Sequence, residues 1–188
     1  MRQVETIGSL VSEFSSFARM PTPVFKRENF TDICRQAIDL QQSAHPDITY
    51  EFKASEKPIF LECDAHQITQ VLTNLLKNAS ESIDEKKITL QDNQKEEKET
   101  LFSPEKIVLQ LSHETQYMCL EIFDTGLGLP KAGRERLTEP YYTTRAQGTG
   151  LGLAIVQKIM QDHHGTLELM DRHDVSGAHV KLFFPIKV

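Results

Sequence analysis

The sequence predicts an α+β fold, a two-layer sandwich in which one mixed sheet carries helices on one face. Two observations predict it. The candidate strands come mostly in adjacent pairs, and a candidate helix lies between one pair and the next. Along the chain the order is helix, two strands, helix, two strands, a glycine-rich loop, helix and two strands, after one further helix at the N-terminus.

The N-terminal helix is predicted over Val4–Ala18, where apolar residues recur at helical spacing. Pro21 and Pro23 end it, because proline cannot continue a helix. Two interpretations stay open: a helix folded back on the domain, or the tail of a helical element that begins outside this chain.

A second helix is predicted from about Phe30 to Ser43, and its end is set by Pro46. Two strand candidates follow. Ile48–Ala54 alternates apolar and polar residues, and Pro58–Cys63 is a short run of β-prone residues.

A long helix is predicted from Asp64 to about Ile83. Asp64 is a good N-cap, and Gln67 three residues later completes a capping-box pattern. Residues 84–106 are polar and dense in charge, including Lys95–Glu99, so we expect a solvated surface loop there.

The C-terminal half contributes two more strand pairs and one helix. The helix runs from Leu151 to about His163, with Gly165 as its expected C′ residue. The expected strands are Ile107–Ser112, Tyr117–Asp124, Thr166–Met170 and Ala178–Ile186.

Composition narrows the class of protein. The 188 residues carry 21 Lys and Arg against 27 Asp and Glu, a net charge of −6 that argues against broad nucleic-acid or anionic-membrane binding. No apolar run reaches the roughly 20 residues of a membrane span, and the N-terminus lacks a secretion-signal pattern. Three cysteines, none in a CxxC pair, fit free thiols in a reducing cytosol.

The long helix carries the first candidate site. Asn74 and Asn78 fall one above the other at the edge of its apolar arc. An amide held there by core packing supplies a carbonyl oxygen to a hard cation. Taken alone, the pair also fits two ordinary asparagines at the border of a solvent face.

Two glycine motifs follow. Asp124 ends a strand and precedes Gly126 and Gly128, so the backbone can turn sharply and the carboxylate can accept a hydrogen bond from an amino group such as that of adenine. An Asx-type turn explains this motif equally well.

The second glycine motif, Gly148–Gly152, opens a helix, where backbone N–H groups and the helix dipole favour an anion. It is neither a Rossmann fingerprint, which needs a βαβ unit, nor a Walker A motif, which needs a GK[ST] ending.

These motifs, in this order, resemble the ATP-binding domain of the GHKL superfamily, which contains histidine kinases, gyrase-type topoisomerases and MutL proteins. Asn74–Asn78 looks like its N box, and the two glycine motifs look like its G1 and G2 boxes. Glu139–Arg145 looks like the F box of the lid. The likeness covers roughly Phe30 to the C-terminus and implies the Bergerat fold.

Two segments narrow the resemblance. Residues 139–156, which read EPYYTTRAQGTGLGLAIV, resemble sensor histidine kinases, and residues 7–25, IGSLVSEFSSFARMPTPVF, resemble the end of the second dimerisation helix in nitrogen-regulation sensors of the NtrY and NtrB type. In ATP-hydrolysing members of the superfamily a glutamate stands four residues before the metal-binding Asn and activates water. Here Asn74 stands at that position. The resemblance therefore implies that ATP is held for transfer to a protein acceptor.

The implied ligands are ATP and Mg²⁺. Asn78 is expected to bind Mg²⁺ with support from Asn74, and Asp124 to bind the adenine amine. The other expected ATP-binding residues are Gly126, Gly128, Thr143, Thr144, Arg145, Gly148, Thr149, Gly150, Leu151 and Gly152. His179, which follows Gly177 and Ala178, stands at a position where the family often has Thr, and this puts an adenine contact from the last strand in question.

The resemblance also divides the chain. Residues 1–22 are expected to be the end of a dimerisation helix, and residues 23–188 the catalytic domain, with a charged loop at 84–106 and a lid at about 129–149. None of the seven histidines has the context of the phosphoacceptor. The implied partners are therefore the histidine-bearing dimerisation domain of the same kinase and a response regulator, and the full-length parent kinase is expected to be a homodimer.

Two other functions stay open: an anti-sigma-type serine kinase of the same superfamily, and a non-catalytic nucleotide-sensing module. The resemblance implies a cytoplasmic domain that contacts neither nucleic acid nor membrane, whether or not the parent kinase is anchored in the inner membrane.

Overall fold

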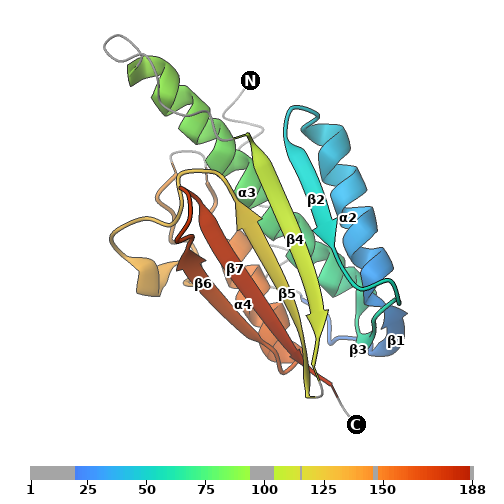
Figure 1. Cartoon of the computed structure of the whole chain (residues 1–188). Helices are drawn as coiled ribbons and strands as arrows, with labels where there is room; N and C mark the ends of the chain where they lie inside the picture. The colour runs from blue at the N-terminus through green and yellow to red at the C-terminus, as the bar shows by residue number, and fades with distance from the viewer. Residues whose placement is uncertain (1–19, 94–103, 115, 146–147, 187–188) are drawn as a thin grey trace.

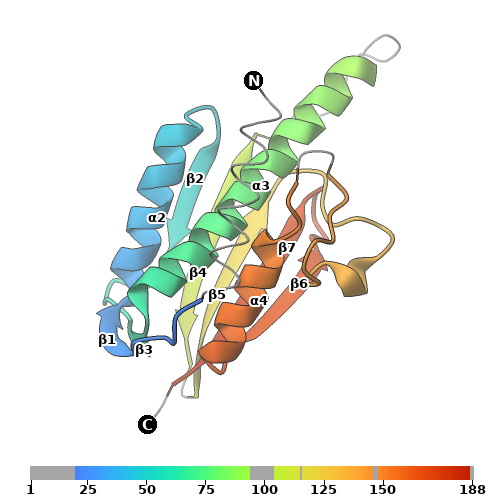
Figure 2. The same ribbon diagram turned by 180° about the vertical axis from the view of Figure 1, so that it is seen from behind.

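The computed structural model describes residues 20–93, 104–114, 116–145 and 148–186, and they form two layers (Figure 1). One layer is a sheet. The other consists of three helices, all on the same face of that sheet, as the reverse view shows (Figure 2). These helices are α2 (Phe30–Ala44), α3 (Ala65–Asn93) and α4 (Gly152–Asp162). The predicted helix over Val4–Ala18 lies outside the described residues.

The main sheet of the described chain has five strands in the order β2-β4-β5-β7-β6. Its strands are β2 (Thr49–Lys53), β4 (Lys106–His113), β5 (Tyr117–Asp124), β6 (Thr166–Asp171) and β7 (Ala178–Pro185). β2 runs parallel to β4, whereas the other neighbours are antiparallel. The predicted mixed sheet with helices on one face is therefore confirmed.

The two strands predicted before α3 do not pair with each other. β2 joins the edge of the main sheet, and β3 (Phe60–Cys63) instead pairs with β1 (Lys26–Asn29), a short strand that the sequence did not reveal. Parallel pairing requires a long crossover connection, and the chain between β2 and β4, which includes α3, provides it.

The core lies between the sheet and the helices. Alternate residues of β4 and β5 are buried under the helices, and α3 buries the apolar arc that its periodicity predicts. The buried apolar residues of α3 are Ile68, Val71, Leu72, Leu75, Leu76, Ala79 and Ile83.

The end of α3 differs from the prediction. Residues 84–93 continue the helix to Asn93, so the expected loop over 84–106 is wrong in its first part. Two lysines anchor this extension: Lys86 Nζ donates to the carbonyl oxygen of Thr125 at 2.7 Å, and Lys87 Nζ pairs with Glu105 at 2.7 Å. No glycine or proline interrupts the segment, so its charges lie on the surface of a helix.

The helix α4 ends one residue earlier than predicted. His164, with φ of 56°, has the left-handed conformation expected of Gly165. Gly165 is needed for a different reason: a Cβ on it would lie 2.5 Å from the carbonyl oxygen of Phe183 and 2.6 Å from Met160 Cε. Among the described helices, none is long and apolar enough to cross a membrane.

Candidate nucleotide-binding site

A cavity of about 470 Å³ opens between α3, the start of α4, the end of β5 and the lid segment. Eleven of the thirteen expected site residues line it: Asn74, Asn78, Asp124, Gly128, Thr143, Thr144, Arg145, Gly148, Thr149, Gly150 and Gly152. Gly126 and Leu151 lie outside its lining. The structure thus brings together residues from widely separated parts of the sequence.

The two asparagines of α3 face the first turn of α4. A Cβ added to Gly152 would lie 3.6 Å from Asn74 Oδ1 and 3.9 Å from Asn78 Nδ2. Their spacing of four residues places both amides on the same face of α3, at the edge of its buried arc. The space between them and α4 is therefore bordered by amide groups on one side and a helix N-terminus on the other.

Asp124 is only 5% exposed and is held by the backbone around it. Its Oδ1 accepts hydrogen bonds from Gly126 N at 2.9 Å and from Ala178 N at 3.1 Å. Burial raises the pKa of this carboxyl, and the two backbone hydrogen bonds act against that rise. A carboxylate fixed in this way can present its remaining acceptor capacity to an amino group in the cavity.

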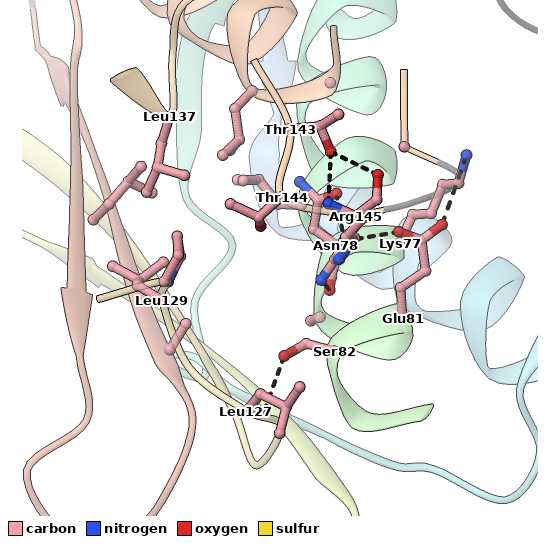
Figure 3. Close-up of a pocket in the computed structure, with 18 of the residues that line it drawn as sticks. Lys77, Asn78, Glu81, Ser82, Leu127, Leu129, Leu137, Thr143, Thr144 and Arg145 are labelled. Carbon is pink, nitrogen blue, oxygen red and sulfur yellow. Dashed lines mark hydrogen bonds and ion pairs between the residues drawn. The ribbon is translucent and has the colours of Figure 1, made fainter. Parts of the chain in front are cut away.

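Helix α3 also supports the loop after Asp124. Ser82 Oγ accepts a hydrogen bond from Leu127 N at 3.0 Å (Figure 3). A Cβ on Gly126 would lie 2.7 Å from the backbone carbon of Ser82, so only glycine allows this approach. Gly126 therefore shapes the loop against α3 without lining the cavity. The role of Ser82 had no signal in the sequence beyond its place one turn after Asn78.

Residues of the last hairpin that the sequence analysis did not single out as site residues lie beside Asp124. Gly177 has φ of 144°, and a Cβ on it would lie 2.8 Å from the backbone carbon of Asp124. Ala178 and Val180 line the cavity. His179 faces the opposite side of the sheet, where it stacks on Phe123 and bonds Glu121 at 3.0 Å.

The glycine-rich loop leaves the first turn of α4 facing the cavity. Gly150 has φ of 68°, and a Cβ on it would lie 2.6 Å from the carbonyl carbon of Tyr141. Leu151 is fully buried, provides no side-chain cap to α4, and donates its N–H to Thr149 Oγ1 at 3.3 Å. The positive end of the helix dipole at Gly152 is thus available to an anion.

The lid segment reaches across the cavity to α3 through Arg145 (Figure 3). Its guanidinium lies 2.8 Å from Glu81 Oε2 and 3.1 Å from Glu85 Oε1. Thr143 Oγ1 accepts the Arg145 N–H at 3.1 Å and so orders this part of the lid. The sequence analysis did not identify Glu81 and Glu85 as site residues. Their spacing of four places both carboxylates on the same face of α3, shortly after Asn78, and could have indicated them.

The donor set fits a magnesium ion that also binds phosphate oxygens. Asn78 Oδ1 is a hard oxygen, and Mg²⁺ is usually held by one or two protein ligands together with phosphates and waters. No group of three or more His, Cys, Asp or Glu side chains suited to a metal occurs in the described residues.

Sequence relatives cover the whole chain. It is 40% identical over 184 residues to nitrogen regulation protein NtrY of Azorhizobium caulinodans. The alignment covers 97% of this chain and 22% of that protein. It is 31% identical over 187 residues to a putative sensor histidine kinase NtrY-like of Rickettsia felis, covering 28% of that protein. The chain therefore spans only about a quarter of the length of these relatives.

Solved structures share the fold. A mycobacterial sensor histidine kinase, MprB, superposes with a TM-score of 0.69 over 87% of this chain and 99% of its own, at 21% identity. The histidine kinase ThkA in complex with the response regulator protein TrrA gives a TM-score of 0.73 over 99% of this chain and 49% of its own, at 18% identity.

A family model extends this likeness to the level of sequence. Residues 63–188, which carry both asparagines of α3, Asp124 and the glycine-rich loop, match the model described as "Histidine kinase-, DNA gyrase B-, and HSP90-like ATPase". Because the match covers well over half of the chain, the protein belongs to this family of ATPase domains.

Proposed function

We propose that this chain binds Mg-ATP and transfers the γ-phosphoryl group to a histidine on a dimerisation domain, for relay to an aspartate of a response regulator. One observation carries the proposal: a single cavity joins the buried carboxylate of Asp124 to Asn78 and to the N-terminus of α4. These groups suit the three parts of Mg-ATP, namely an amino group, a cation and an anion.

Each end of the cavity has its own task. Asp124 would accept a hydrogen bond from the adenine amine, and Gly128 would line the base and sugar. The first turn of α4 and the loop of Gly148 and Gly150 would receive the phosphates. Asn78 would hold Mg²⁺, supported by Asn74, and the ion would neutralise charge on the phosphate oxygens.

The side chains around the phosphate end favour transfer over hydrolysis. Asn74 cannot take a proton from water, because an amide is not a base. The domain would therefore act by positioning the phosphoryl group and neutralising its charge, and the incoming histidine would be the nucleophile.

The proposed partners follow from this chemistry. The nucleophile would come from the dimerisation domain of the same kinase, in a homodimeric parent protein. The neighbouring structure of ThkA holds a response regulator protein, which supports a relay of the same kind. We propose that the domain works in the cytoplasm, where response regulators receive phosphoryl groups.

Calorimetry tests the metal assignment. Asn78→Asp changes the charge and the hydrogen-bonding capacity of the proposed ligand, so Mg-ATP affinity should change by about tenfold. Titration of ATP with excess chelator should show a much smaller difference between the variant and the wild type. Equal Mg-ATP affinity of the two proteins would contradict the role of Asn78.

A transfer assay tests the reaction. The chain is incubated with γ-labelled ATP and a separate helical hairpin that carries a phosphoacceptor histidine. Acid-labile, base-stable label on the hairpin supports the histidine kinase. Acid-stable phosphoserine on a partner protein would favour the serine kinase, and tight ATP binding without any transfer would favour the sensing module.

A further inference from the structure

Arg145 has four contacts on α3, and each of them involves a group that lines the cavity. Its Nη1 lies 2.8 Å from Glu81 Oε2, and its Nε lies 3.1 Å from Glu85 Oε1. Its Nη2 donates to the backbone oxygen of Asn78 at 3.1 Å, and Nη1 lies 3.5 Å from the side-chain Oδ1 of the same residue. All three guanidinium nitrogens are thus engaged by one face of one helix.

This arrangement is more than a surface ion pair. Arg145 is 26% exposed, against 40% for Glu81 and 42% for Glu85. A planar guanidinium binds two carboxylates and a carbonyl in a fixed orientation, which lysine cannot reproduce. Figure 3 shows Arg145 extending from the lid, beside Thr143 and Thr144, to Asn78 and Glu81 on α3. The lid is therefore attached to the helix by a specific set of contacts.

The same contacts conflict with a cation on Asn78. The Oδ1 atom of Asn78 faces the Arg145 guanidinium, and a Mg²⁺ ion at that oxygen would stand next to a fixed positive charge. The charges of the cavity lining also bear on how a triphosphate would bind. The described lining contains three cationic side chains, Lys77, Lys131 and Arg145, and three acidic ones, Glu81, Glu85 and Asp124. A triphosphate would gain little from Arg145 while two carboxylates hold it.

We propose that Glu81 and Glu85 are positioning residues that hold Arg145 over Asn78, so that this latch and Mg-ATP binding exclude each other. The latch consists of Arg145, Asn78, Glu81 and Glu85. Binding of Mg-ATP releases the guanidinium from the carboxylates and lets it pair with the triphosphate. The inference rests on the proposed ATP binding, and it adds a competition that sets the affinity and the position of the lid.

The first test uses no nucleotide. Trypsin must take the Arg145 side chain into its own pocket to cut after it, so the latch slows that cut. In the double variant E81Q/E85Q, cleavage after Arg145 should become about three- to tenfold faster. The matched control is Glu139→Gln, which removes the carboxylate that pairs with Arg136 at 3.0 Å in the same lid. It should accelerate cleavage after Arg136 and leave Arg145 unchanged.

The second test is a double-mutant cycle on Mg-ATP affinity. With Arg145 present, E81Q/E85Q should bind Mg-ATP about three- to tenfold more tightly than the wild type, because the latch no longer competes. In an Arg145→Gln background the same two substitutions should have no such effect. Arg145→Lys should give an intermediate result, because it keeps the charge and loses the planar fork.

Three outcomes separate the possibilities. If E81Q/E85Q tightens binding equally with and without Arg145, the carboxylates only repel the triphosphate and the latch is overturned. Unchanged cleavage after Arg145 and unchanged affinity overturn it as well. If the folded wild type binds no Mg-ATP in calorimetry but the trypsin result holds, the proposed function has failed while the contact between lid and helix stands.

Discussion

At Asp124, burial and hydrogen bonding act in opposite directions on one carboxyl group. Burial raises its pKa, and the N–H groups of Gly126 and Ala178 favour the ionised form. The position of Ala178 N depends on Gly177. With its φ of 144° and no Cβ, this glycine lets the start of β7 lie close to Asp124 at the end of β5. A single glycine in the last hairpin therefore shapes the environment of the proposed adenine acceptor.

Gly177→Ala should damage both stability and binding. A Cβ there would lie 2.8 Å from the backbone carbon of Asp124, in a conformation that L side chains rarely adopt. We expect a loss of about 2–4 kcal/mol in the free energy of unfolding and weaker ATP binding, measured by denaturant titration and calorimetry.

Gly152→Ala is the matched control for this prediction. Its new Cβ would come no closer than 3.6 Å to Asn74 Oδ1, and its backbone is the first turn of α4. The free energy of unfolding of this variant should stay within about 1 kcal/mol of the wild type. Equal stability of the two alanine variants would contradict the role given to Gly177.

The three cysteine thiols should be unreactive in the folded protein. Cys34, Cys63 and Cys119 are buried and free. Burial raises the pKa of Cys63 to about 12 and that of Cys119 to about 11, and it raises the pKa of Cys34 as well. The reactive thiolate is therefore scarce at neutral pH. A colorimetric thiol reagent at pH 8 should react slowly with the native chain and rapidly with all three thiols in denaturant.

At the scale of elements, Asp64 fixes the start of α3. Its Oδ1 accepts the N–H groups of His66 at 3.0 Å and Gln67 at 3.1 Å, and its Oδ2 accepts Val24 N at 2.9 Å. The predicted capping box is only half formed, because Asp64 N donates to His163 Nε2 and not to the Gln67 side chain, whose amide nitrogen donates to the carbonyl oxygen of Pro21. Asp64 thus caps the helix and also holds the segment that enters the domain.

Asp64→Ala should cost about 1–2 kcal/mol in the free energy of unfolding, because it leaves these N–H groups without their acceptor. Asp64→Asn, which keeps one acceptor oxygen, should recover at least half of that loss. Denaturant titration of both variants at pH 7 measures the difference. If the two variants are equally unstable, the charge of Asp64 matters and the cap does not.

Sequence patterns found the elements whose residues repeat at a regular spacing. The apolar arc of α3 and the alternation in β4 and β5 reflect burial on one face, and burial is what such periodicity records. The end of α3 was misplaced because its extension is held by Lys86 and Lys87 through contacts with distant residues. The strand β1 was missed because four residues that pair only with β3 leave no pattern of their own.

The candidate site divides in the same way. Asn78, Asp124 and the glycine-rich loop have recognisable spacing, since each depends on backbone geometry within a few residues. Glu81 and Glu85 acquire their role only when the lid brings Arg145 against α3. Arg145 and Glu81 are 64 positions apart in the sequence. A contact between distant segments depends on the fold, so local spacing could not indicate it.

At the scale of the whole molecule, α4 connects the cavity to the opposite end of the domain. Its first residue, Gly152, lines the cavity, and its C-cap, His163, lies against the start of α3. His163 Nε2 accepts the N–H of Asp64 at 3.1 Å, while Nδ1 lies 2.9 Å from the carbonyl oxygen of Ile159. The ring also packs on Phe25, with centroids 5.0 Å apart. One neutral imidazole therefore joins α3, α4 and the entering segment.

This arrangement predicts how the stability of the domain depends on pH. Burial lowers the pKa of His163 below 6.5, and the hydrogen bond from Asp64 N requires an unprotonated Nε2. The unfolded chain therefore binds a proton as pH falls through about 6.5, and the folded chain does so only at lower pH. The stabilisation is complete above that value and is lost progressively below it.

The free energy of unfolding should therefore fall by up to about 1 kcal/mol per pH unit from this residue between pH 7 and pH 5.5. His163→Gln, whose amide oxygen can still accept from Asp64 N, should be less stable at pH 7.5 and should depend less on pH in this window. His66→Gln, at an exposed position in the first turn of α3, is the control and should keep the wild-type slope. Asp124, whose raised pKa acts in the opposite direction, and His179, whose lowered pKa acts in the same direction, are common to all three proteins and cancel in the comparison. Denaturant titrations at several pH values measure the slopes, and equal slopes for the wild type and His163→Gln would remove His163 from this role.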